Sequence, residues 1–342
     1  MRIISFSFLL LAFILLSCEK EEKIEISDAA FISFTTNGQT LPTAIHKPTR
    51  ELRFEVDTNV DVRTLMPHFD IPELCEVYVN GVRQTSGNST VDFTNPVLYE
   101  LKDVNNRTVT WKASAVKLTK KILIDASHDG GVWWFPQYGT YDQNKPHQGQ
   151  RFADLLRKDG YIVDELGRGA ELTEEMFFGY YIVIRADGFM PYTPKELSVY
   201  TNLIDRGMNL VFFTDHKKND PVDELGDYLG LHFRGIANGV VNKFKSQAIT
   251  ENLTSLDYIA GSVLTDYKDN KKIEVLGWLR EQDYGDINMN GVKDADEPSA
   301  PAVMGILKYP KCSIFFVGDM NGLQIMPQPF IDNLKRWMGN GL

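Results

Sequence analysis

Four short polar segments in the second half of the sequence could do chemistry, because each follows an apolar run typical of a buried strand. Residues 127–131, 185–188, 214–216 and 318–321 contribute the side chains His128, Asp129, Asp187, Asp215, His216 and Asp319. In an open parallel sheet, ligands bind outside the carboxyl ends of the strands. We therefore expect these side chains to line one crevice, since gathered carboxylates repel one another unless a cation or polar ligand lies between them. The alternative is that each Asp caps a helix or closes a turn.

A loop rich in aromatic residues follows the first of these segments. Residues 130–141 include Trp133, Trp134, Phe135, Tyr138 and Tyr141. Loops run over the protein surface, so five aromatic side chains in one loop are hard to explain as core. Flat aromatic faces beside Asp, Asn and Gln are a usual means of stacking on sugar rings. We expect Trp133, Trp134 and Tyr138 to form such a surface; the alternative is a lid or a contact with the N-terminal module.

Residues 286–297 match the pattern of a calcium-binding loop. Oxygen-bearing residues alternate along the segment, a glycine permits the sharp turn, and a glutamate closes it, which suits Ca²⁺. The predicted ligands are Asp286, Asn288, Asn290, the Val292 carbonyl, Asp294 and Glu297. The following Pro-Ser-Ala-Pro, 298–301, cannot form the exiting helix of an EF-hand. We expect an isolated loop with a structural Ca²⁺; the alternative is a turn-rich insertion that matches the pattern without binding metal.

The elements that must hold these residues lie within 119–342, where apolar strands and amphipathic helices alternate. Residues 122–126, 161–163, 180–184 and 209–213 read as strands, and 148–158 reads as a helix. Thr193 and Glu196 form a capping box with Pro194 at the first helical position, and this helix stops at Gly207. Strands that are apolar on both faces and joined by such helices predict a doubly wound α/β domain with a parallel sheet.

Residues 28–118 have a different sequence pattern, in which short β-rich segments are separated by turn residues such as Asn80-Gly81 and Asn95-Pro96. This spacing predicts an all-β sandwich. The segment 91–99, followed by 108–115, resembles the last hairpin of the Ig-like domains found at the start of many Bacteroidetes surface lipoproteins. The resemblance implies an Ig-like spacer that holds the second domain away from the membrane.

The first 17 residues have the pattern of a secretory signal, with one cation, a short apolar run and a small residue before the cleavage point. Residues 15–18, Leu-Leu-Ser-Cys, resemble a bacterial lipobox, which implies that Cys18 carries lipid and that 18–27 form a tether. An uncleaved anchor is the alternative. The following 20–22, Lys-Glu-Glu, resemble the signal that sends Bacteroidetes lipoproteins to the outer face of the outer membrane. We expect an outer-membrane lipoprotein, either displayed on the surface or facing the periplasm.

The composition narrows the range of partners. A formal net charge of −10 excludes a general nucleic-acid binder, because there is no basic surplus to displace counterions from phosphates. After Cys18 only Cys75 and Cys312 remain, one in each half of the chain. We expect no disulfide between them and no metal site built on cysteine, and we interpret both as small buried hydrophobic residues.

Taken as a whole, residues 121–342 resemble the class I glutamine amidotransferase-like superfamily, which has a flavodoxin-like sheet. The resemblance rests on the strand 122–125 with its His-Asp-Gly-Gly turn, on 180–184 before Asp187-Gly188, and on 203–213. Active members place a cysteine in a tight glycine elbow directly after the strand that corresponds to 209–213. This chain has Thr214, Asp215 and His216 there. Glutamine hydrolysis is therefore not expected, since the chain offers neither a thiolate nor a strained elbow at this point.

Three functional hypotheses follow from these residues. The first is a catalytically silent domain that binds a glycan, with hydrogen bonds from His128, Asp129, Asp187, Asp215 and Asp319. The second is a hydrolase that uses the same groups, with Asp129, Asp215, His128 and His216 as the candidate catalytic residues; paired carboxylates are the usual acid and base of glycoside hydrolases. The third is a structural partner within an outer-membrane assembly.

Overall fold

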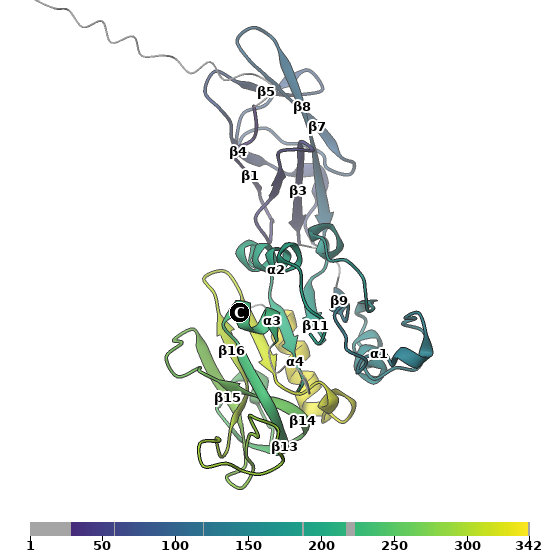
Figure 1. The fold of residues 1–342 in the computed structure, drawn as a ribbon. Helices are drawn as coiled ribbons and strands as arrows, with labels where there is room; N and C mark the ends of the chain where they lie inside the picture. The colour runs from purple at the N-terminus through teal and green to yellow at the C-terminus, as the bar shows by residue number, and fades with distance from the viewer. Residues whose placement is uncertain (1–28, 58, 119, 187, 217–222, 341–342) are drawn as a thin grey trace, which may run out of the picture.

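The computed structural model describes residues 29–57, 59–118, 120–186, 188–216 and 223–340. A small β domain stands on one end of a larger α/β domain (Figure 1). The predicted signal segment 1–17, the tether 18–27 with its lipidation site Cys18, and Asp187 lie outside the described residues. Within them, no helix combines the length and apolar character needed to cross a bilayer.

The N-terminal domain is a β-sandwich. It contains β1 (Ser33–Thr36), β2 (Ala44–His46), β3 (Glu51–Val56), β4 (Pro67–Asp70), β5 (Glu76–Val79), β6 (Val82–Arg83), β7 (Val97–Lys102) and β8 (Thr108–Lys117). One sheet has the order β2-β3-β8-β7-β5-β6, and β1 pairs with β4 in the second. Alternate residues of β1, β4, β5 and β7 are buried, and Phe31 contacts Phe34, Tyr99 and Trp111 edge-on in the core that the two sheets share.

The α/β domain is built on a nine-stranded sheet. Its parallel half has the order β10-β9-β11-β12-β17, with β9 (Lys121–Asp125), β10 (Ile162–Leu166), β11 (Ile182–Arg185), β12 (Leu210–Phe213) and β17 (Ser313–Val317). This is the strand order of a flavodoxin-like domain. The predicted fold class, a β-sandwich followed by a doubly wound α/β domain, is confirmed.

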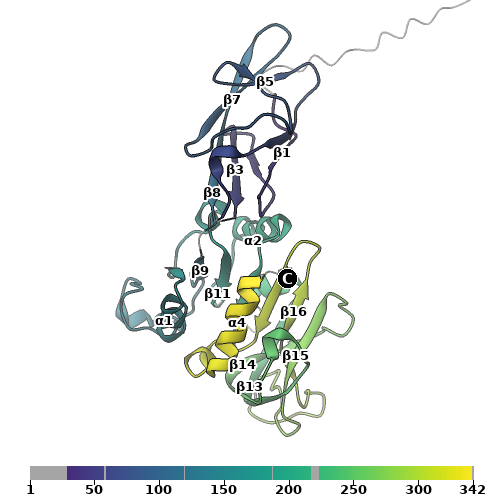
Figure 2. The same cartoon turned by 180° about the vertical axis from the view of Figure 1, so that it is seen from behind.

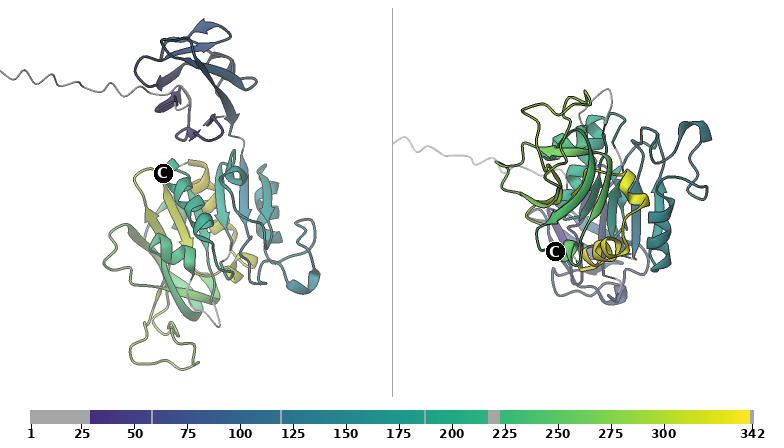
Figure 3. Two further views of the ribbon diagram at one scale, coloured as in Figure 1. Left: turned by 45° about the horizontal axis from the view of Figure 1, so that its top comes forward. Right: turned by 90° about the horizontal axis from the view of Figure 1, so that it is seen from below.

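Helices cover both faces of this sheet, as the views from behind and from below show (Figures 2 and 3). The helices α1 (Gln150–Lys158) and α4 (Gln328–Asn340) share one core, while α2 (Pro194–Arg206) and α3 (Glu224–Leu229) share the core on the other face. The predicted capping box of α2 is present, with Thr193 and Glu196 satisfying each other's backbone N–H groups. The helix ends at Gly207, whose φ of 92° is in the left-handed region.

The sheet is mixed, which corrects the expectation of a purely parallel sheet. Beyond β17 it continues through β16 (Ala302–Lys308), β15 (Ile273–Leu279), β13 (His232–Phe244) and β14 (Leu256–Thr265), all antiparallel to their neighbours. The connection from β16 to β17 spans only residues 309–312. A parallel pair would need a crossover of about a dozen residues, so this short connection requires an antiparallel pair.

A buried carboxylate joins the two domains. Glu55 at the end of β3 is fully buried, and its Oε1 accepts a hydrogen bond from the backbone N–H of Gly179 at 3.0 Å. Its Oε2 lies 3.5 Å from Nη2 of Arg206 on α2. Burial raises the pKa of Glu55, and the Gly179 N–H and the Arg206 charge oppose that rise. The sandwich is therefore held on the α/β domain by a specific polar contact as well as by the chain connection.

Candidate functional site at the carboxyl edge of the sheet

Three of the predicted site residues come together where β12 and β17 end side by side. His216 Nδ1 lies 2.9 Å from Oδ1 of Asp215, and Asn321 donates a hydrogen bond to Oδ2 of Asp215 at 2.7 Å. Asp319 follows β17, and its carboxylate accepts the backbone N–H groups of Ile259 and Gly322. Because adjacent parallel strands end at the same edge, the two segments meet although they are about a hundred residues apart in the sequence.

Burial and proximity perturb the pKa of each titratable group in this cluster. Asp215 and Asp319 are 3% and 2% exposed, and burial raises both pKa values. The pKa of Asp319 reaches about 7, because the negative charge of Asp215 adds to the effect of burial. The hydrogen bond that the His216 imidazole makes to the Asp215 carboxylate raises the pKa of His216, against the effect of its own partial burial. Near neutral pH the cluster can therefore hold protons on both an imidazole and a carboxyl group.

An open groove of about 600 Å³ begins at His216. Its walls include Asn238 from β13 and Tyr284, Asp286 and Met289 from the insertion between β15 and β16. The imidazole of His216 is the reachable member of the cluster, since 30% of its side chain is exposed while the Asp215 side chain behind it is buried. The groove thus combines an imidazole, an amide and an aromatic ring.

The calcium-type loop forms one wall of this groove. The carboxylate of Asp286 accepts the backbone N–H groups of Asn290 and Gly291, and that of Glu297 accepts those of Ile287 and Asp294. The side-chain amides of Asn288 and Asn290 both donate to Asp294. Three of the predicted ligand side chains, Asn288, Asn290 and Asp294, therefore meet, and Gly291 has the positive φ, 82°, that the turn requires.

The donor set of this loop suits a hard cation only in part. Its carboxylate oxygens are engaged by the loop's own N–H groups, and the Val292 N–H is satisfied by the side chain of Asn290. Among the described residues, no group of three or more His, Cys, Asp or Glu side chains is arranged to hold a metal ion. Binding of Ca²⁺ would require Asn288 and Asn290 to turn their amide oxygens inward, which a simple rotation of each amide achieves.

Asp129 does not join the cluster and has a structural role instead. Its carboxylate accepts the backbone N–H groups of four successive loop residues, Gly131, Val132, Trp133 and Trp134, at 2.8–3.0 Å. Arg168 adds a fifth contact, at 3.2 Å. Both oxygens are fully occupied and the residue has no exposed surface. The prediction that Asp129 binds ligand or acts as an acid or base is therefore corrected: it shapes the loop.

The aromatic loop is pinned inward, which corrects the predicted stacking role of Trp133 and Trp134. Their exposed fractions are only 1% and 3%, and Trp133 packs in the core between sheet and α1. Of the three predicted stacking residues only Tyr138, at 52%, presents a face to solvent. An aromatic ring must be reachable on one face to stack on a sugar, so the two indoles cannot do so here. Trp133 and Trp134 therefore form neither the predicted sugar-stacking surface nor the alternative contact with the N-terminal domain.

A buried glutamate that the sequence did not point to holds this loop in place. Glu165 on β10 accepts hydrogen bonds from Trp133 Nε1, at 3.1 Å, and Tyr141 OH, at 2.5 Å, through one oxygen, and from Arg157 Nη2 at 2.8 Å through the other. The fully buried His147 ring lies 3.3 Å from the same carboxylate. These hydrogen bonds lower the pKa of Glu165 despite its burial. The sequence offered little signal, because β10 contains two adjacent acidic residues, Asp164 and Glu165, and only the second is fully engaged in the interior.

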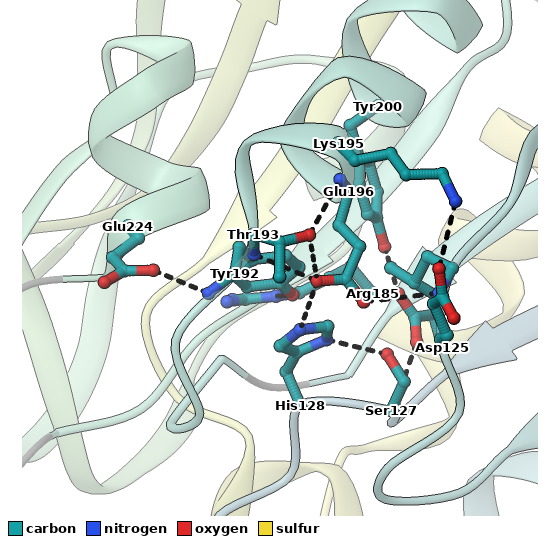
Figure 4. A network of polar contacts seen from close by, with 12 residues as sticks. Asp125, Ser127, His128, Arg185, Tyr192, Thr193, Lys195, Glu196, Tyr200 and Glu224 are labelled. Carbon is teal, nitrogen blue, oxygen red and sulfur yellow. Dashed lines mark hydrogen bonds and ion pairs between the residues drawn. The ribbon is translucent and has the colours of Figure 1, made fainter.

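His128 lies in a second, separate network beneath α2 (Figure 4). Its Nδ1 is 2.8 Å from Ser127 Oγ, its Nε2 is 3.6 Å from Oε2 of Glu196, and its ring stacks on Tyr192 with centroids 3.7 Å apart. Burial lowers the pKa of His128, so the ring is predominantly neutral at neutral pH. With 6% exposure it is not open to a ligand, which corrects its predicted role as a binding or catalytic residue.

The predicted side chains that the structure describes thus lie in three separate environments. Asp215, His216 and Asp319 share the edge of β12 and β17, Asp129 holds its own loop, and His128 belongs to the network under α2. Asp187 lies outside the described residues. Gln148, which precedes α1, connects to the cluster by donating to Asn321 at 3.1 Å. The expectation of one crevice that receives all of these side chains is therefore only partly met.

The position after β12, where the amidotransferase resemblance calls for a nucleophilic cysteine, holds the Asp215–His216 pair. Cys312 is buried at the opposite end of the parallel strands, at the start of β17, where burial raises the pKa of its thiol to about 11. Cys75 is half-buried in the other domain, and both cysteines are free. A protonated thiol at the wrong end of the sheet cannot serve as a nucleophile at the edge.

Comparison with known proteins gives likenesses among solved structures. No family model matches the chain, and no curated protein matches it. The N-terminal domain of mmIFT52 is 11% identical, with 65% of this chain and 98% of that one covered and a TM-score of 0.48. A protein described as ThuA-like from Bacteroides uniformis is 17% identical over 64% of this chain and 90% of that one, with a TM-score of 0.43. A β-galactosidase from Bacillus circulans is 14% identical over 65% of this chain and 31% of its own, with a TM-score of 0.40.

The strand order and the edge residues together define the class of this protein. It is a two-domain chain whose β-sandwich precedes a flavodoxin-like α/β domain, and the described part of that domain has the Asp215–His216 pair directly after β12.

Proposed function

We propose that this protein is a lipid-anchored envelope protein whose α/β domain binds a glycan in the groove beside His216. The observation that carries the proposal is the composition of the groove, where Tyr284, Asn238 and His216 line one open space of about 600 Å³. Binding of a sugar combines one apolar ring face with a few well-placed polar groups. The role first predicted for Trp133 and Trp134 passes to Tyr284.

The chemistry of the cluster favours a neutral, hydroxyl-rich ligand. Asp215 and Asp319 lie behind His216, and the chain is acidic overall, with a net charge of −10. An anionic ligand would be repelled by this background, whereas sugar hydroxyls can donate to carboxylate and amide oxygens and accept from the imidazole. A structural Ca²⁺ on residues 286–297, held by Asp286, Asn288, Asn290, Val292, Asp294 and Glu297, would keep the Tyr284 side of the groove in place.

The test is glycan-array and affinity-gel binding of the full chain and two variants. Tyr284→Ala should lose retention, because it removes the ring face of the groove. Tyr228→Ala is the matched control, since Tyr228 is a 53% exposed tyrosine on α3 and does not line this groove. Failure of the unmodified protein to bind any polysaccharide, or equal loss in both variants, would refute glycan binding in this groove.

A hydrolase is the second candidate, favoured by one specific observation. His216 is hydrogen-bonded to Asp215 and partly exposed, which is the arrangement of a general base held by a carboxylate, and Asp319 nearby has a pKa of about 7. Turnover of a chromogenic glycoside or ester panel that His216→Ala abolishes would support this reading. Tight glycan binding without turnover would support the first candidate function, a glycan-binding domain without catalysis.

The anchor is tested separately in cells. Cys18→Ala should release the protein from the membrane fraction if Cys18 carries the lipid, while Cys75→Ala should leave it there. Protease treatment of intact cells then distinguishes display on the surface from a periplasmic location.

A further inference from the structure

The large hydrophobic side chains that the structure describes are most exposed at one end of the sandwich. The three highest exposed fractions belong to Leu74 (76%), Val104 (70%) and Ile32 (67%). Leu74 lies in the loop before β5 and Val104 in the loop after β7, and these strands pair so that Glu76 is opposite Lys102. Leu74 and Val104 are therefore both two residues beyond the same end of that pair.

Ile32 reaches the same end from the other sheet. Its N–H donates to the carbonyl of Asp70, where β4 leaves the sheet toward Leu74. The strand β8 runs from Thr108 at this end to Lys117 beside the α/β domain. The apolar tip, which we define as Ile32, Leu74 and Val104, is thus the end of the molecule farthest from the candidate site (Figure 1).

The backbone of Leu74 gives no folding reason for a leucine at this point. Its φ is 65°, in the left-handed region that Gly and Asn adopt readily and that is strained for a bulky side chain. A leucine that is both strained and 76% exposed lowers the stability of the free protein. Several exposed apolar side chains that lie at the same end of a protein, as Ile32, Leu74 and Val104 do, indicate a contact with a partner or a membrane.

The chain enters the structure at the same end, and this identifies the partner. Ala29 is fixed there through its carbonyl, which accepts a hydrogen bond from Trp111 Nε1 at 3.2 Å. Cys18 lies eleven positions earlier, since 29 − 18 = 11, and a chain of that length spans at most about 40 Å. A lipid on Cys18 would hold the apolar tip within reach of the bilayer.

We propose that the apolar tip inserts into the membrane interface and fixes the orientation of the protein, with the groove of the α/β domain facing away from the bilayer. This inference rests on the proposed lipid anchor. A lipid on Cys18 would limit how far the protein can move from the membrane but would not fix its orientation, so a second contact is physically useful. Glu73 adjoins Leu74, and Asp103 in the neighbouring loop is paired with Arg107. The tip therefore offers no basic surplus for anionic lipid, and its partner is a zwitterionic surface.

The test attaches the chain to phosphatidylcholine vesicles by a hexahistidine tag in place of Cys18, on chelating lipid, so that its result does not depend on natural lipidation. An environment-sensitive fluorophore is placed at Val104→Cys, in a Cys75→Ala background. The matched control is Val82→Cys, since Val82 is 64% exposed in the same domain but lies beyond the opposite end of β5. We expect several-fold stronger quenching by doxyl lipids at position 104 than at position 82.

Two outcomes decide the proposal. Adding Ile32→Ser and Leu74→Ser should reduce quenching at position 104 to the level at position 82, with an unchanged circular dichroism spectrum. Equal quenching at both positions in the tagged protein would overturn the proposal. Release of Cys18→Ala from cell membranes is a separate result, so a failed anchor and a failed tip are distinguishable.

Discussion

Arg185 and Asp223 form a two-point ion pair in the interior of the α/β domain, with Nη1–Oδ2 and Nη2–Oδ1 distances of 2.7 and 2.9 Å. Both side chains are almost fully buried, at 1% and 3% exposure. The pair joins the end of β11 to the start of α3, and the Asp223 carboxylate also caps that helix by accepting the N–H of Gly226. Charges that are this well buried must compensate each other, and the Arg185 charge lowers the pKa of Asp223 against the effect of burial.

We predict that Asp223→Asn destabilises the protein by about 3–5 kcal/mol, because it leaves the Arg185 charge buried without a counter-charge. Asn caps helices as well as Asp does, so the loss reports the ion pair and not the cap. Urea unfolding measures it. Asp154→Asn, which removes the half-exposed partner of Arg157, should cost at most about 1 kcal/mol. Similar losses in the two variants would contradict this account.

The parallel half of the sheet could be predicted from the sequence because its strands and helices are specified by residues close together in the chain. Continuous apolar runs such as 122–126 have to be buried on both faces, and Thr193 with Glu196 defines a helix start within four residues. The antiparallel half is harder to predict, because the register of β13 against β14 shifts between Arg234 and Ala237, which interrupts the alternating pattern.

The candidate site could be predicted only in part, because burial depends on distant partners. Asp215, His216 and Asp319 converge as the strand-end rule requires. Trp133 and Trp134 are buried because Asp129 collects the loop N–H groups and Glu165, on another strand, binds the Trp133 indole. The identity of a loop residue does not show whether a distant part of the fold supplies a hydrogen-bond acceptor that buries it.

The Asp215–His216–Asp319 cluster makes stability depend on pH in a defined direction. All three pKa values are raised in the folded state, so folding favours the protonated forms. Their stabilising contribution is complete below the unfolded pKa and is lost as pH rises through the folded one. For Asp319 this window runs from about 3.9, its unfolded value, to about 7.

We therefore predict that the unfolding free energy contributed by this cluster decreases between about pH 4 and pH 7, and that Asp215→Asn flattens this dependence. The substitution removes the charge that raises the pKa values of Asp319 and His216, so an NMR titration should show the His216 pKa falling. Asp269→Asn, in an exposed turn, is the control. An unchanged His216 titration would rule out the coupling.

Loss of the Glu165 carboxylate should loosen the aromatic loop. Glu165→Gln keeps the size of the side chain but removes the charge that binds Arg157 and accepts from Trp133 and Tyr141, and we expect a loss of about 1.5–3 kcal/mol. Hydrogen exchange within residues 133–147 should accelerate. Glu171→Gln is the control, because its partner Lys195 is exposed. It should lower the free energy of unfolding by at most about 1 kcal/mol and leave the exchange rate of the loop unchanged. Unaltered exchange in Glu165→Gln would show that the loop is held by other contacts.

Calcium should stabilise the protein if residues 286–297 bind it, because a ligand that binds only the folded state raises the unfolding temperature. We expect the unfolding temperature in Ca²⁺ to exceed that in chelator by several degrees. Asp286→Ala should abolish this difference, whereas the Asp269→Ala control should keep it. The readout is the difference between the two conditions, since Asp286→Ala also removes the acceptor of the Asn290 and Gly291 N–H groups and lowers stability in both. Identical curves for the unmodified protein would leave the loop as a metal-free turn that shapes the groove beside His216.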